Sequence, residues 1–141
     1  MVAIVDALVF ISVLSIAAFG LFAYTDCSET EVTMAESISN DLFSMELKAC
    51  DICDTSDTTV YPISTLIAVC IEENDVHSAE QFLKSTLDSM IPATHGYSLT
   101  IEFNDSVISV QRQGADEVSS SYETDHDVEG IGKMRSMLTL F

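Results

Sequence analysis

Apolar and polar residues are distributed unevenly along the chain, and the first segment is almost entirely apolar. Between Asp6 and Asp26 lie 19 consecutive uncharged residues. As an α-helix they would extend about 28 Å, close to the hydrocarbon thickness of a bilayer. The pattern therefore predicts a helix over residues 1–25 that is hydrophobic on every face, including the positions of Val9, Val13 and Ile16.

A second helical pattern follows over residues 28–49, and it is amphipathic. Ser28 and Glu31 have the spacing of a capping box at a helix start. Apolar residues then recur at intervals of three and four, at Val32, Ala35, Ile38, Leu42, Met45 and Ala49. We expect this helix to continue the first one almost collinearly, with one packed stripe and its other faces in solvent.

The next segments predict a loop and two further helices. Residues 50–62 show neither the helical nor the strand spacing of apolar residues, and they end in Pro62, which is typical of a loop. Residues 63–73 form a short apolar run, and residues 75–92 place apolar side chains at helical spacing before Pro92. Both segments are interpreted as helices.

The C-terminal third predicts an antiparallel sheet. Residues 96–114 alternate around Asn104-Asp105, which indicates a β-hairpin. A polar stretch over 111–130 leads to the apolar segment 134–141, which we expect to close the sheet as an edge or central strand.

The predicted fold class is therefore α+β. A long hydrophobic N-terminal helix is extended by an amphipathic helix and followed by two short helices and a few-stranded antiparallel sheet. The predicted domain division places the hydrophobic helix at 1–25 and an acidic domain at 26–141.

Charge excludes two classes of partner. The chain has 23 acidic and 5 basic residues, for a net charge of −18. Asp6 is the only charged residue among the first 25, so residues 26–141 carry −17. Nucleic acid and anionic lipid headgroups bind basic surfaces, and a chain with this balance would repel both.

Three interpretations of the apolar segment remain open. A cleavable secretory signal would need a basic region and small residues at its exit, but no Lys or Arg precedes Lys48. A plain membrane anchor would usually carry flanking basic residues that set its orientation. The third interpretation, which we favour, is that a basic leader has been removed upstream of residue 1.

Asp6 is costly to place in an apolar helix, so it needs a partner. A terminal α-amino group is positive at neutral pH and could pair with it, either within one chain or between copies. The alternative is that Asp6 simply lies in the headgroup region.

The segment MVAIVDALVFISVLSIAAFGLFAY resembles the processed N-terminus of archaeal type IV pilin-like subunits. The resemblance implies that a peptidase removes a leader, that the helix is held in the membrane, and that it then packs with its copies in a filament core. It gives Asp6 the position of the family's early acidic residue. The residues expected to serve subunit assembly are Asp6, Val9, Val13, Ile16, Ala17 and Gly20.

Four cysteines, at positions 27, 50, 53 and 70, permit three complete pairings. A continuous helix would separate Cys27 and Cys50 by about 34 Å, too far for a disulfide. We therefore favour a bond of Cys70 with Cys53 or Cys50 if the domain lies outside the cell. A zinc site and a redox motif at Cys50-Asp-Ile-Cys53 fit the spacing less well.

Two further motifs are candidates only. Asp125, Asp127 and Glu129 begin like a calcium loop, but the expected bidentate glutamate is replaced by Ser136. Asn104-Asp105-Ser106 matches a glycosylation sequon. We expect no enzyme activity and no cofactor, because the histidines are scattered and no phosphate loop is present.

The sequence therefore favours a structural subunit of an extracellular filament, inserted in the membrane before assembly and packed with identical copies. A role in adhesion or surface attachment would follow. The alternative is a monomeric, membrane-anchored domain that binds a ligand or divalent cation outside the cell.

Overall fold

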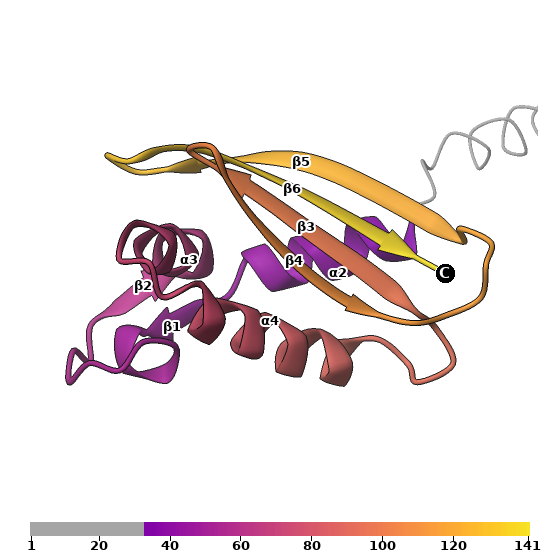
Figure 1. Ribbon diagram of the computed structural model, residues 1–141, viewed down its shortest axis with the longest axis horizontal. Coiled ribbons are helices and arrows are strands. Elements are labelled where there is room, and N and C mark those ends of the chain that lie inside the picture. The colour runs from indigo at the N-terminus through magenta and orange to yellow at the C-terminus, as the bar shows by residue number, and fades with distance from the viewer. Residues whose placement is uncertain (1–32) are drawn as a thin grey trace, which may run out of the picture. The chain divides into compact units, whose positions relative to one another are not determined.

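Four antiparallel strands form the main sheet of the domain, in the order β4-β3-β6-β5 (Figure 1). The computed structural model describes residues 33–141. The strands are β3 (Tyr97–Phe103), β4 (Ser106–Arg112), β5 (Ser120–Val128) and β6 (Gly132–Leu140).

A two-residue turn sets the register of β3 and β4. Asn104 and Asp105 have φ values of 45° and 58°, the left-handed pair that a type I′ hairpin turn requires. The turn pairs Phe103 with Ser106, and the register continues to the pair of Tyr97 with Arg112. The hairpin predicted around Asn104-Asp105 is confirmed.

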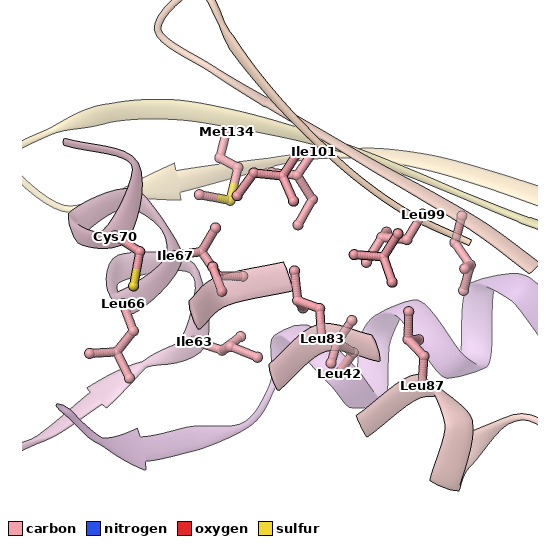
Figure 2. Packing of buried hydrophobic residues seen from close by; sticks show 14 of the residues in the cluster. Leu42, Ile63, Leu66, Ile67, Cys70, Leu83, Leu87, Leu99, Ile101 and Met134 are labelled. Atoms are coloured by element: carbon pink, nitrogen blue, oxygen red, sulfur yellow. The ribbon is translucent and has the colours of Figure 1, made fainter. Parts of the chain in front are cut away.

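The helices cover one face of this sheet. They are α2 (Met34–Phe43), α3 (Ile63–Glu72) and α4 (Val76–Met90). α2 packs against β5 and β6, while α4 packs against β4 (Figure 1). Alternate residues of β3 and β6 point into the core between these layers, where they meet apolar side chains of α3 and α4 (Figure 2). The described residues therefore form an α+β domain.

The two predicted helices in the middle of the chain are confirmed. Seven of the ten residues of α3 are buried, because the helix lies inside the core. Asn74, with φ 64°, ends α3 in the left-handed conformation, and the N–H of Asp75 donates to the carbonyl of Cys70. α4 buries a single stripe, Ala79, Leu83 and Leu87, and ends two residues before Pro92.

The helix predicted over 28–49 is wrong in its bounds. Within the described residues, Thr33 is an N-cap with extended backbone, and its side chain accepts a hydrogen bond from the N–H of Glu36. Helix α2 ends at Phe43, where the Ser44 hydroxyl donates to the carbonyl of Asp41. Side-chain hydrogen bonds of this kind compete with continued helix and so limit it at both ends. The expected packed stripe is kept at Ala35, Ile38 and Leu42.

The predicted loop contains more structure than expected. β1 (Glu46–Lys48) pairs with β2 (Val60–Pro62), and the 3₁₀ turn η1 (Ala49–Asp51) follows β1. Strands of three residues are too short to show a period, so the sequence gives no signal for them.

The polar stretch over 111–130 also forms a strand, β5, which the sequence did not predict. Only Val128 of its nine residues is buried, because β5 is an edge strand with one face in solvent. The last predicted strand is confirmed as β6, which takes the central position and not the edge.

The two edges of the sheet differ in charge. β5 exposes Glu123, Asp125 and Asp127, whereas β4 exposes the uncharged side chains of Val107, Ser109 and Gln111. β4 and β5 each pair with one strand only in the part of the chain that the structure describes.

We predict that Gly96→Ala destabilises the domain. A Cβ atom at Gly96 would lie 2.3 Å from the Cα and N atoms of Gly114, and Gly96 also exchanges backbone hydrogen bonds with Phe141. Because both neighbours are backbone, relief requires the sheet end to move, and we expect a loss of about 2 kcal/mol in the free energy of unfolding. Denaturant unfolding of the full-length chain measures this.

Gly130→Asn is the matched control for Gly96→Ala. Gly130 has open space around it and a φ of 76°, which asparagine tolerates. A Gly96→Ala midpoint equal to that of the control would contradict the predicted close approach.

Candidate functional site

Cys53 and Cys70 lie together although 17 positions separate them. Their Sγ atoms are 3.2 Å apart. Cys70 comes from the buried face of α3, beside Leu66 (Figure 2), and Cys53 follows η1, where its N–H donates to the carbonyl of Ala49. Cys50, by contrast, is exposed. Of the two pairings favoured from the sequence, the structure brings together Cys53 and Cys70.

The surroundings of Cys70 suppress its ionisation. Burial raises the pKa of this thiol to about 12, and the neighbouring Cys53 and the charges of Asp75 and Glu73 act in the same direction. The thiolate is the reactive form of cysteine, so Cys70 is a poor nucleophile in its reduced state.

A pocket of about 360 Å³ lies beside this thiol pair. Its wall includes the half-buried Cys53 and four acidic residues, Asp54, Asp57, Glu73 and Asp75. The lining contains no basic residue, so the pocket would attract cations and repel anions.

Asp57 is the most firmly held of these carboxylates. The backbone N–H of Thr59 donates to one oxygen at 2.9 Å, and the hydroxyl of Tyr61 donates to the other at 3.3 Å. Hydrogen bonds from Thr59, supported by Tyr61, hold the pKa of Asp57 below its ordinary value. Asp57 therefore remains charged in mildly acidic solution.

A second cluster joins the end of α4 to the sheet. The Tyr97 hydroxyl donates to Asp88 at 2.9 Å, and the Arg112 guanidinium contacts the same carboxylate at 3.2 Å. Arg112 also donates to the carbonyls of Ile91, Pro92 and His95 and lies 5.1 Å from the centre of the Tyr97 ring. Burial raises the pKa of Tyr97, and the hydrogen bond from Tyr97 lowers the pKa of Asp88. Arg112 is fully engaged within the domain, so this cluster is structural.

His126 connects β5 to α2 and β6. Its ring stacks on Phe43 with a centroid distance of 3.9 Å, and its Nε2 lies 2.8 Å from the buried hydroxyl of Ser136. Burial lowers the pKa of His126, while the charge of Asp125 opposes this shift. The neutral imidazole is therefore the form that suits the folded domain.

The calcium-loop candidates do not form a loop. Asp125 and Asp127 lie on strand β5 with exposed side chains, and Glu129 follows in the turn to β6. Asp125 accepts a hydrogen bond from Arg135 at 3.1 Å, so this carboxylate is already paired with a guanidinium group. Across residues 33–141, no three His, Cys, Asp or Glu side chains are grouped closely enough to hold a metal ion.

Asn104 lies at the exposed tip of the β3–β4 hairpin, as the sequence predicted. Its side-chain amide donates to Glu72 at 3.2 Å. The glycosylation of Asn104 stays a prediction.

The expected assembly residues and Cys27 lie outside the described residues. They are Asp6, Val9, Val13, Ile16, Ala17 and Gly20. Within residues 33–141, none of the helices combines the length and apolar character needed to cross a bilayer.

Comparison with known proteins found no matching family, no matching curated protein and no matching solved structure.

The sequence analysis predicted neither the cluster of Tyr97, Asp88 and Arg112 nor the contact of His126 with Phe43. Part of the first cluster could have been inferred from the hairpin. The predicted turn at Asn104-Asp105 places Tyr97 opposite Arg112 by counting outward along the hairpin. The contact of His126 with Phe43 could not have been inferred, because it joins α2 to strand β5, which the sequence did not predict.

We predict that His126 makes stability depend on pH. Its pKa in the folded domain lies below the unfolded value of 6.5, so the unfolded chain binds the proton more readily. The stability contributed by neutral His126 is full above pH 6.5 and declines as the pH falls through that value toward the folded pKa. Loss of the ring stack in His126→Asn should cost about 1 kcal/mol at pH 7.5, and this difference should shrink by pH 5.

Denaturant unfolding of both chains between pH 5 and 7.5 measures that difference. His77→Asn, on the exposed side of α4, controls for the loss of an imidazole as such. A gap between His126→Asn and the parent that is constant over this range would refute the proposed titration.

Proposed function

We propose that this protein is a structural subunit of an extracellular filament of the type IV pilus kind, serving adhesion or surface attachment. The observation that carries the proposal is the run of 19 uncharged residues after Asp6, followed directly by a strongly acidic α+β domain. The resemblance of the first 25 residues to archaeal pilin-like subunits supports the same function.

Association in such a filament would come from packing between the apolar segments. Lipid is as apolar as these side chains, so contact between copies must supply the driving force through close packing. Val9, Val13 and Ile16 would provide the packing surface, and the small residues Ala17 and Gly20 would let neighbouring backbones approach.

The core of the described domain supports separate roles for the apolar segment and the acidic domain. Residues 33–141 form a compact unit with a continuous buried cluster from α2, α3, α4 and the sheet. These residues therefore contain an apolar core of their own, and the proposal assigns the apolar segment to contacts with other copies.

A second candidate function is a monomeric, membrane-anchored domain that binds a ligand outside the cell. The pocket lined by four carboxylates favours it. A small organic cation suits this pocket better than a divalent metal ion, because no trio of metal ligands converges in the described residues.

Two observations would separate these functions. Mass spectrometry of the native N-terminus shows whether a leader has been removed, and electron microscopy of sheared surface material shows whether fibres contain this chain. A retained leader and the absence of fibres would favour the anchored domain.

We predict that Asp6→Ala reduces fibre yield at least tenfold while the amount of subunit in the membrane is unchanged. In an assembled core the carboxylate would pair with a positive group of a neighbouring copy, such as the amino terminus that leader removal would create. Removing one partner of a buried pair costs about 3–5 kcal/mol. Asp6→Glu keeps the charge and should be milder.

Asp26→Ala is the matched control, since it removes a carboxylate at the other end of the apolar run. Quantitative blotting of sheared fibres and of membranes gives both yields. If Asp6→Ala assembles as well as Asp26→Ala, Asp6 has no role in assembly.

We also predict that fibres are most durable in high salt. Domains of net charge −17 repel one another, and the screening length falls from about 30 Å at 0.01 M to about 3 Å at 1 M salt. Fibres should persist in 1 M NaCl and dissociate after dialysis to 10 mM, as sedimentation would measure. Sucrose at equal osmolality is the control, and fibres that survive dilute buffer equally well would disprove the claim.

A further inference from the structure

The contact between Cys53 and Cys70 joins the segment after η1 to helix α3. Within the segment from Ala49 to Thr59, the buried apolar side chains are those of Ala49 and Ile52, which belong to the core. Cys53 is the next residue after Ile52 and reaches α3 at Cys70. The Sγ separation of 3.2 Å is about 1.2 Å longer than a disulfide bond, a gap that small side-chain rotations can close.

We propose that Cys53 and Cys70 form a structural disulfide in the mature protein and that Cys50 remains outside it. The proposal is independent of filament assembly, because it rests on residues of the described domain alone. Cys50 is exposed, and its thiol lies 4.0 Å from the carboxylate of Asp51, its neighbour in the chain.

The bond forms by two thiol–disulfide exchanges with a small disulfide as the oxidant. The thiolate of Cys53, which borders the pocket, attacks one sulfur of the oxidant and releases one thiol. Cys70 ionises only rarely, but its Sγ already lies 3.2 Å from that of Cys53. On losing its proton, Cys70 attacks the Cys53 sulfur of the mixed disulfide and releases the second thiol. Two electrons pass to the oxidant, the two cysteine protons end on the two released thiols, and the new bond joins the two Sγ atoms.

The environment favours a stable bond over a catalytic one. Catalytic disulfides are easily reduced when their surroundings stabilise the thiolate that reduction releases. Here the buried site of Cys70 and the nearby carboxylates of Glu73 and Asp75 have the opposite effect. The oxidised pair should therefore resist reduction, and its contribution is to hold residues 49–59 against α3.

The acidic pocket should also make oxidation selective for reagent charge. An oxidant reaches Cys53 past the carboxylates of Asp54 and Asp57. Dicationic cystamine should therefore react several-fold faster than anionic oxidised glutathione in dilute buffer, and the difference should shrink in 0.5 M salt.

The experiment uses the reduced full-length chain in neutral detergent. After oxidation with cystamine, remaining thiols are alkylated, and peptides are mapped by mass spectrometry without reduction. We expect the Cys53–Cys70 peptide pair in the parent and in Cys50→Ser. A map dominated by a bond of Cys50 or Cys27, or by alkylated Cys53 and Cys70, would overturn the proposal.

Thermal unfolding supplies a second readout. Cys53→Ser should unfold roughly 10 °C below the oxidised parent and close to the reduced parent, because the cross-link restricts the unfolded chain. Cys50→Ser, whose side chain is exposed, should match the oxidised parent. Equal unfolding temperatures for Cys53→Ser and the oxidised parent would also overturn the proposal.

Discussion

The buried face of the four-stranded sheet is the constraint on which the rest of the domain depends. β3 contributes every second side chain to it, and a slip of one residue would turn all of them to solvent. The turn at Asn104 and Asp105 prevents such a slip, because two left-handed residues alone connect the strands and allow one register. With this register fixed, α2, α3 and α4 have a single apolar surface to cover.

The same register organises the polar contacts at the far end of the hairpin. It places Arg112 opposite Tyr97, within reach of Asp88 and of the backbone carbonyls that follow α4. The guanidinium satisfies the carbonyl of Ile91, the C-cap residue of α4, together with the carbonyls of Pro92 and His95 in the segment that follows. A turn of two residues thus determines how a helix 20 Å or so away is anchored, since seven residues of strand span about that length.

The sequence predicted the elements in which apolar spacing alone decides the structure. The hairpin, α4 and β6 bury regular stripes, α3 is a nearly continuous apolar run, and each was predicted close to its observed position. The elements it missed depend on partners elsewhere in the chain. β5 is a strand because β6 pairs with it, although its own residues are almost all polar.

The candidate site shows the same limit. The choice of Cys70 with Cys53 or Cys50 followed from the sequence, but only the fold of residues 44–62 distinguishes the two partners. The end of α2 at Phe43 was not predictable from its apolar stripe, which continues formally to Ala49. Local hydrogen bonds of Ser44 and the pairing of β1 with β2 prevail over that stripe.

The acidic character of β5 has a consequence for the behaviour of the protein in solution. An edge strand offers unpaired backbone groups to any other strand, and charged side chains are a common protection against such aggregation. On β5 this protection consists of the exposed carboxylates at positions 123, 125 and 127. The acidity of this strand therefore keeps concentrated protein from associating edge to edge along β5.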